Sequence, residues 1–292
     1  MNDDGARPGS EDAPWRASNR QGTQRTQRTR RAQRTQPTRR AWIHPAPGIA
    51  VTHSRLDHTA SVILTREESS GAVSALVVDP CWTPEELDAL AADVRTWGLD
   101  VVAGFATHAH YDHVLWHPEL GDVPRWASPG TARLARTHAE DNRTGLRASA
   151  AGWTTELLDL AGAVRAFPTV DHLRDWAEVI VHDAHSTGHA ALWLSEPQVL
   201  IAGDMLSDIE IPIFAETGAR AYLDGLQMLR PYADAAQVLI PGHGTITDQG
   251  ARRWAADQRY VEDLLAGRES ADPRLHSESN RGPHAHNLAA LG

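Results

Sequence analysis

The sequence predicts an α/β fold whose strands carry polar residues to a shared edge, and two observations lead to this prediction. Short apolar runs of strand length recur along the chain and alternate with segments of helical periodicity. Each of five runs ends close to a residue that can bind a metal or transfer a proton, which is the layout expected for a site along one sheet edge. The five runs are Ala75–Val78, Val101–Ala106, Glu178–Val181, Val199–Gly203 and Val238–Gly242.

Local signals define the first elements. Val62–Leu64 and Ala75–Val78 read as two strands around the turn region at Gly71. Thr83 is suited to cap the helix that follows, and Glu86 can complete a capping box three residues later. We therefore expect a helix directly behind the second of these strands.

Similar signals define the later elements. A helix should open at Ser128 and run to about His138, and a hairpin should form around Glu196 and Pro197. Further helical segments are expected at residues 154–166, 220–230 and 248–266.

The densest group of metal-binding side chains directly follows the second apolar run, in the pattern His-x-His-x-Asp-His. His108 and His110 lie two residues apart in an extended segment, so they point to the same side and can share one metal. Asp112 and His113 lie just beyond, where the chain can turn towards a neighbouring metal. Imidazole and carboxylate ligands without thiolate suit zinc, iron or manganese.

This series of residues resembles the metallo-β-lactamase superfamily from about residue 50 to 266, and all five motifs of that family occur in order. The resemblance implies an αβ/βα sandwich, in which two mixed β-sheets pack back to back with helices outside. It also implies a site for two metal ions, usually zinc. The residues that match the motifs are Asp79, His108, His110, Asp112, His113, His185, Asp204 and His243.

The same resemblance implies a role for each of these residues. The first metal would be bound by His108, His110 and His185. The second metal would be bound by Asp112, His113 and His243. Asp204 would bridge the two metals, and Asp79 would orient a ligand or the metal-bound water.

Two choices concern residues next to the motifs. His185 and His189 compete for the third position on the first metal; the family pattern His-[Ser/Thr]-x-Gly-His favours His185, which leaves His189 to support a ligand from behind. Trp82 and Trp116 each follow a motif closely, so they could wall an apolar substrate pocket or serve only in packing.

The expected reaction follows from two adjacent metals. Two ions about 3.5–4 Å apart can share a hydroxide and lower its pKa to near neutral. We expect this hydroxide to hydrolyse a small acyl substrate: an ester, a thioester or a lactone. Asp112, Asp204 or a metal-bound water would protonate the leaving group.

Departures from the patterns of individual family members narrow the range of expected substrates. Class B β-lactamases usually carry Cys where this chain has Asp204, so β-lactams are not the expected substrate. Glyoxalase II adds a helical C-terminal domain with basic residues for glutathione, whereas only 49 residues follow His243 and none is lysine.

Two other functions stay open at this point. A mononuclear iron oxygenase of the persulfide dioxygenase type shares the His-x-His-x-Asp-His pattern and would hold one iron instead of two zinc ions. A nucleic-acid-processing hydrolase recruited by the basic N-terminal segment would show a salt-dependent affinity that is lost without residues 1–40.

The charge distribution bears on the last alternative. Residues 1–41 hold ten arginines and four acidic residues, whereas residues 42–292 hold 18 arginines and 34 acidic residues. An acidic body repels phosphodiester polymers, so we expect a small-molecule substrate and no nucleic-acid partner.

Three regions are expected. Residues 1–41 should be a disordered Arg/Gln/Thr-rich extension, 42–266 the catalytic domain, and 267–292 a polar tail whose histidines are solvated. No apolar run reaches the roughly 18 residues of a membrane span, and no secretory signal is apparent. We therefore expect a cytoplasmic protein with no membrane partner, and the oligomeric state stays open.

Overall fold

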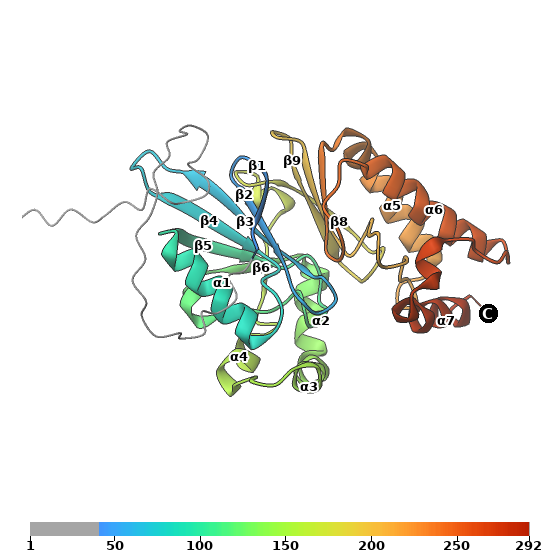
Figure 1. The fold of residues 1–292 in the computed structure, drawn as a ribbon, viewed down its shortest axis with the longest axis horizontal. Helices are drawn as coiled ribbons and strands as arrows, with labels where there is room; N and C mark the ends of the chain where they lie inside the picture. The colour runs from blue at the N-terminus through green and yellow to red at the C-terminus, as the bar shows by residue number, and fades with distance from the viewer. Residues whose placement is uncertain (1–40, 292) are drawn as a thin grey trace, which may run out of the picture.

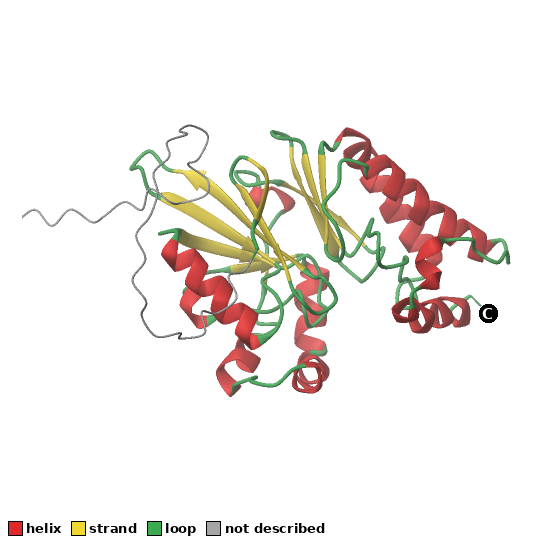
Figure 2. Ribbon diagram, viewed as in Figure 1, coloured by secondary structure: helices red, strands yellow, loops and turns green. Residues whose placement is uncertain are grey.

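Two β-sheets lie face to face, with helices on the outer side of each (Figure 1, Figure 2). The computed structural model describes residues 41–291. The prediction of a disordered N-terminal extension falls almost entirely outside the described residues. The four-layer arrangement is the αβ/βα sandwich that the family resemblance implies.

The first sheet has seven strands in chain order. Its first four strands pair antiparallel, and parallel pairing then continues from β4 to β7. The strands are β1 (Ile43–Ala46), β2 (Ile49–His53), β3 (Ala60–Glu67), β4 (Val73–Val78), β5 (Asp100–Phe105), β6 (Arg125–Ala127) and β7 (Arg165–Ala166).

The second sheet has four strands in the order β11-β10-β9-β8. β9 runs antiparallel to both of its neighbours, and β10 runs parallel to β11. The carboxyl ends of β8, β10 and β11 therefore meet at one edge. The strands are β8 (Glu178–His182), β9 (His189–Leu194), β10 (Val199–Gly203) and β11 (Val238–Pro241).

Helices α1 to α4 lie on the side of the first sheet, and α5 to α7 on the side of the second (Figure 1). Within the described residues, every helix is too short or too polar to cross a bilayer. The helices are α1 (Pro84–Thr96), α2 (Pro129–Thr137), α3 (Ala139–Ser149), α4 (Thr155–Leu160), α5 (Ala219–Ala235), α6 (Gly250–Leu265) and α7 (Arg281–Ala289). Short 3-10 turns lie at Pro118–Leu120, Val170–Leu173, Pro273–His276 and Glu278–Asn280.

Strands with two buried faces explain the layering. Val62 and Leu64 belong to the apolar cluster between the sheets, together with Ile201 of the second sheet. Ile63, which points the other way, packs in a separate cluster with Leu90 of α1. Because successive side chains alternate across a strand, an unbroken apolar run supplies both clusters at once.

One helical prediction needs correction, and one helix was not predicted. The segment 154–166 is helical only to Leu160, because the chain then pairs Arg165 and Ala166 with β6 as strand β7. α3 was not predicted, because it is largely polar and only Leu146 is fully buried, which leaves little apolar periodicity to detect.

The C-terminal segment is also more ordered than a solvated tail. Arg274, Asn280 and Asn287 are buried, whereas His276 and His286 are exposed as predicted. His284 is half-buried and contacts the Tyr260 hydroxyl at 2.8 Å through Nδ1. A polar composition indicated solvation here, but these polar groups find partners inside the protein.

Glu86 connects the predicted capping box to the loop after β2. Its side chain completes the box at Thr83, as predicted. The same carboxylate accepts hydrogen bonds from Ser54 Oγ at 2.7 Å and from the Arg55 backbone N–H at 2.9 Å. The start of α1 therefore fixes the loop that leads to Asp57.

Glu86→Ala should lower the free energy of unfolding by about 2–3 kcal/mol, because it leaves buried donors without their charged acceptor. Glu85→Ala is the matched control: Glu85 is exposed and pairs with Arg55 at the surface, so its loss should cost at most about 1 kcal/mol. Chemical denaturation of both variants measures the difference. Equal losses for the two variants would contradict the prediction.

Candidate metal centre

The seven predicted ligands meet between the ends of the two sheets. Six of them are buried, and His110 is half-buried. Four follow β5, and the other three follow β8, β10 and β11. The structure brings together His108, His110, Asp112, His113, His185, Asp204 and His243.

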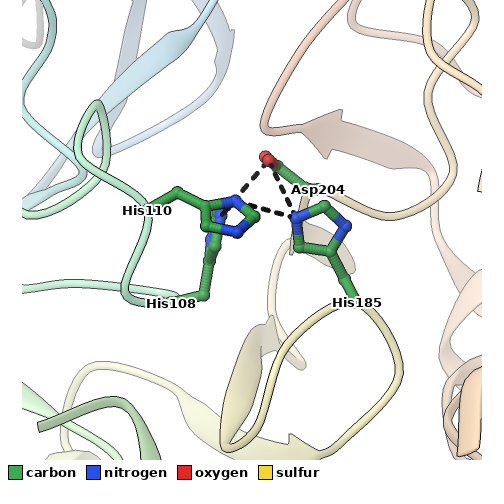
Figure 3. Close-up of side chains that lie close together, drawn as sticks. All are labelled: His108, His110, His185 and Asp204. Carbon is green, nitrogen blue, oxygen red and sulfur yellow. Dashed lines mark hydrogen bonds and ion pairs between the residues drawn. The ribbon is translucent and has the colours of Figure 1, made fainter. Parts of the chain in front are cut away.

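The first ligand group comprises His108, His110, His185 and Asp204 (Figure 3). His110 Nδ1 lies 3.0 Å from His108 Nε2 and 3.0 Å from His185 Nε2. Asp204 Oδ2 lies 3.2 Å from His108 Nε2 and 3.5 Å from His185 Nε2. The ligand atoms of all four side chains therefore converge on one small volume.

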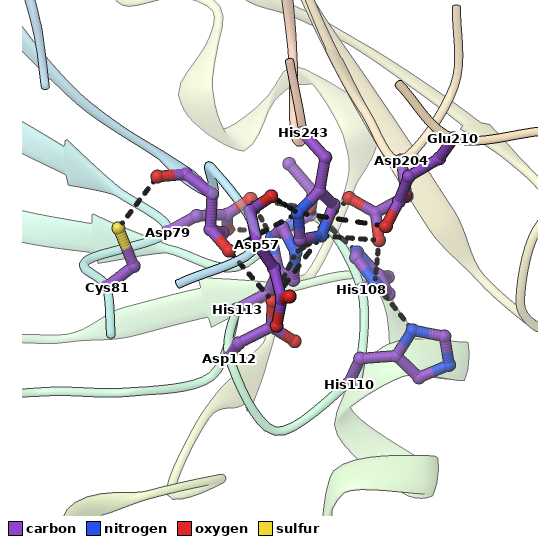
Figure 4. Close-up of polar contacts among 12 residues, drawn as sticks. Asp57, Asp79, Cys81, His108, His110, Asp112, His113, Asp204, Glu210 and His243 are labelled. Carbon is purple, nitrogen blue, oxygen red and sulfur yellow. Dashed lines mark hydrogen bonds and ion pairs between the residues drawn. The ribbon is translucent and has the colours of Figure 1, made fainter. Parts of the chain in front are cut away.

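The second ligand group comprises Asp112, His113 and His243 (Figure 4). Asp112 Oδ2 lies 3.4 Å from the Nε2 atoms of both histidines, which are 3.3 Å apart. Asp204 also faces this group: its Oδ1 is 3.2 Å from His113 Nε2, and its Oδ2 is 3.3 Å from His243 Nε2. One carboxylate thus adjoins both groups.

The donor set and its spacing fit divalent metal ions. Tetrahedral zinc with bonds of about 2.0–2.1 Å places its ligand atoms about 3.3 Å apart, and the distances here run from 3.0 to 3.5 Å. Although His113 Nε2 lies 3.2 Å away, the buried Asp204 Oδ1 accepts no hydrogen bond from the described residues. A bound cation would give this oxygen the partner that a buried polar atom requires.

Asp79 holds His113 from behind. It accepts hydrogen bonds from the Thr107 backbone N–H at 2.8 Å and from Thr107 Oγ1 at 2.6 Å, and it lies 2.9 Å from His113 Nδ1. A proton on Nδ1 leaves the lone pair of Nε2 directed at the second ligand group. These contacts are those of a residue that orients a metal ligand.

His185 and His189 occupy different environments. His189 Nε2 accepts a hydrogen bond from the Asp204 backbone N–H at 3.1 Å, and its ring stacks between those of His108 and His182. A Cβ at Gly203 would lie 2.5 Å from that nitrogen, so the backbone must approach His189 closely. His189 therefore positions Asp204 from behind, while His185 Nε2 points into the first ligand group.

The two ligand groups differ in their electrostatics. Burial, together with His108, lowers the pKa of His110 to about 3, and burial with His110 lowers the pKa of His185. Burial acts in the same direction at His243, but Asp204, Glu210 and Asp112 together outweigh it and raise the pKa of His243 to about 10. Without metal, His110 and His185 are therefore neutral at pH 7, whereas His243 carries a proton.

Three contributors were not predicted from the sequence. The Asp57 carbonyl lies 2.8 Å from His243 Nδ1, and Thr59 Oγ1 donates to Asp112 Oδ2 at 3.1 Å. Glu210 Oε1 lies 3.9 Å from His243 Nδ1, and burial raises the pKa of Glu210 to about 7. The feature of the sequence that could have pointed to Glu210 is its position in the loop after β10, close behind Asp204.

The two tryptophans lie in different places. Trp82 is buried and contacts Tyr111, with ring centroids 5.4 Å apart, close behind the His-x-His-x-Asp-His loop. Trp116 packs against Arg125 and lines a cavity of about 580 Å³ that includes none of the candidate ligands. Trp82 therefore lies against the loop that carries the candidate ligands, whereas Trp116 faces this outer cavity and shares only a small one, of about 10 Å³, with His113.

Comparison with known proteins relates this geometry to a family. The sequence profile of the Metallo-beta-lactamase superfamily matches residues 70–243. A hydroxyacylglutathione hydrolase of Synechococcus sp. (strain JA-2-3B'a(2-13)) is 30% identical over 166 residues, which cover 56% of this chain and 57% of that protein. The chain thus spans a little over half the length of this relative.

Solved structures show the same fold at low sequence identity. A Beta-lactamase domain protein from Burkholderia ambifaria has a TM-score of 0.60 at 20% identity over 88% of both chains. A metallo-beta-lactamase family protein from Thermus thermophilus has a TM-score of 0.58 at 22% identity over 84% of this chain and 92% of that chain.

Zinc uptake by the second ligand group should release protons. The pKa of His243 is raised to about 10, so at pH 7 its imidazole carries a proton that a metal ion must displace. At pH 7 the whole proton of His243 should be released on zinc binding, and this release should disappear only as the pH rises towards 10. The apparent affinity should accordingly fall as the pH falls.

Calorimetric titration with zinc, in buffers of different ionisation enthalpy, counts these protons. His243→Ala should release fewer of them than the wild type. Zinc uptake at pH 7 without proton release would contradict the charge assignment.

His185→Ala and His189→Ala should affect zinc binding differently. His185→Ala removes a nitrogen from the first ligand group, so it should lose high-affinity zinc there. His189→Ala removes only support behind Asp204, a change that typically costs about 10–100-fold in affinity. Zinc titration of both variants tests this order, and the reverse order would show that His189 is the ligand.

Proposed function

Because the chain belongs to the metallo-β-lactamase superfamily, we propose that it is a metal-dependent hydrolase of a small acyl substrate: an ester, a thioester or a lactone. The proposed cofactor is a pair of zinc ions, for which iron or manganese could substitute. The first ion would be held by His108, His110 and His185. The second would be held by Asp112, His113 and His243, with Asp204 shared between them.

The position of Asp204 is the observation that supports this proposal most directly. Its carboxylate lies within 3.5 Å of ring nitrogens from both ligand groups. A carboxylate placed in this way can bind both members of a pair of close metal ions. A single-metal site would need only one of the two groups.

When bound, the ions would lower the pKa of a water molecule to near neutral and polarise the substrate carbonyl. Proton transfer to the leaving group would fall to Asp112, Asp204 or a metal-bound water. Burial raises the pKa of each carboxyl, but the facing His113 and His243 outweigh it and hold both values below the ordinary range. Both carboxylates are therefore ionised at neutral pH and are weak bases, so either would hold a proton only while passing it to a leaving group.

Two observations support an acyl substrate. The curated relative is named for the hydrolysis of an acylated glutathione. The chain has a formal net charge of −10, with its acidic excess in residues 42–292, which disfavours polyanionic substrates. For these reasons we place the small acyl compound ahead of a nucleic acid.

The proposal can be tested on protein purified without added metal. Elemental analysis should find two zinc ions per chain, and a screen of esters, thioesters, lactones and a phosphodiester should find hydrolysis of an acyl compound. Removal of metal by a chelator should abolish the activity, and added zinc should restore it. One iron per chain, with oxygen consumed on a persulfide, would instead indicate the dioxygenase function.

Asp204→Asn is the matched variant for this test. The loss of a shared anionic ligand should reduce kcat/KM by at least about 100-fold, the upper end of what supporting residues contribute. Asp208→Asn is its control, because Asp208 lies in the same loop and pairs with Arg253 and Thr245. Asp208→Asn should keep metal-dependent hydrolysis. If Asp204→Asn also hydrolysed the substrate at the normal rate, Asp204 could not be a ligand shared by the two ions.

A further inference from the structure

The C-terminal segment, residues 272–289, folds back onto the loop that begins at Asp204. This segment contains two short 3-10 turns and α7, which lies beside the ends of α5 and α6 (Figure 1). The loop from Asp204 to Phe214 joins β10 to α5 and has no helix or strand of its own. The backbone groups of the loop must therefore find partners elsewhere in the protein.

Arg274 supplies several of these partners. Its Nη1 donates to the carbonyls of Ser207 at 2.9 Å and Glu210 at 2.8 Å. The same guanidinium pairs with Asp257 at 2.7 Å and with Asp272 at 2.7 Å. The arginine is only 8% exposed, so its donors are directed at the protein and not at solvent.

Asp257, on α6, extends the contact to the residues next to Asp204. Its Oδ2 accepts hydrogen bonds from the Leu206 backbone N–H at 3.0 Å and from the Tyr222 hydroxyl at 3.1 Å. Leu206 has a φ of +61°, a conformation that is unfavourable for leucine. Such a backbone persists only where its surroundings hold it, and here Asp257 and Arg274 do so.

Two asparagines of the same segment hold the rest of the loop. Asn280 Nδ2 donates to the Ile209 carbonyl at 2.7 Å. Asn287 accepts from the Phe214 backbone N–H at 3.0 Å and donates to the Pro212 carbonyl at 2.6 Å. The segment therefore contacts the loop along its length, from Ser207 to Phe214.

The loop is in turn connected to the ligand groups at more than one point. Asp204 begins it, and the Ser207 hydroxyl donates to the His243 carbonyl at 2.7 Å. Glu210, whose carbonyl contacts Arg274, places its side chain near His243 and Asp204. A displacement of the loop would therefore move ligands of both groups.

We propose that Arg274 is a positioning residue of the metal centre, which fixes the Asp204–Glu210 loop through its contacts to Ser207, Glu210 and Asp257. The proposal rests on the proposed function, because it takes Asp204 as a ligand shared by two ions. The planar guanidinium is required, since it reaches two carbonyls and two carboxylates in fixed directions. A lysine ammonium keeps the charge but cannot make this set of bonds.

Arg274→Lys tests the proposal, with Arg268→Lys as the matched control. Arg268 lies a few residues earlier, is exposed and pairs only with Asp263 among the described residues. Three measurements are made on the full chain: amide hydrogen exchange of residues 206–210 without metal, the dissociation constant for zinc, and kcat and KM of the zinc-loaded protein. Thermal unfolding shows that each variant is folded.

Arg274→Lys should show faster amide hydrogen exchange at residues 206–210 and should bind zinc at least about 10-fold more weakly. Its kcat should fall by a larger factor than its KM rises. Arg268→Lys should match the wild type in all three. A purely structural role would lower the unfolding temperature of Arg274→Lys but leave exchange at 206–210 and zinc affinity as in the control, and this result would overturn the proposal.

A second variant covers the case in which Arg274→Lys does not fold. Asn280→Ala removes one contact to Ile209. Faster exchange at residues 206–210 together with weaker zinc binding would support the proposal, and no change in either would overturn it.

Amide hydrogen exchange and zinc affinity do not depend on catalysis. A wild type without metal-dependent hydrolysis would thus overturn the proposed function and still leave Arg274 to be judged by exchange and zinc affinity.

Discussion

The buried carboxylate of Asp204 is the constraint on which the rest of the structure depends. Its oxygens lie 3.2–3.5 Å from the ring nitrogens of four histidines. An ionised carboxylate is costly to bury unless positive charge faces it, so these imidazoles, or metal ions held by them, must converge there. The neighbouring backbone has little freedom: a Cβ at Gly242 would overlap Asp204 Oδ1.

The two-sheet architecture completes the centre because each ligand group draws on both sheets. In the first group, His108 and His110 follow β5, whereas His185 and Asp204 follow strands of the second sheet. The second group likewise combines residues that follow β5 with His243 after β11. The apolar packing between the sheets therefore sets the distances between the halves of each group, and a shift of one sheet on the other would separate them.

Buried polar side chains hold three loops around the candidate metal centre. Loops lack the regular hydrogen bonds of sheets and helices, so their backbone groups need other partners. Asp79 supports the loop after β5, Glu86 the loop after β2, and Arg274 the loop after β10. These three residues lie far apart in the sequence, and each forms hydrogen bonds with the backbone of a loop around one site.

The sequence by itself determined the features that depend on local spacing. The capping box at Thr83, the alternation that builds two buried sheets, and the grouping of His108 with His110 all follow from the periods of strands and helices. Only the tertiary structure decided that Glu210 lies beside His243, and that Arg274 is buried against the loop after β10 and not in a solvated tail. Those contacts join residues distant in sequence, and a polar side chain reads the same in a sequence whether water or a buried carbonyl is its partner.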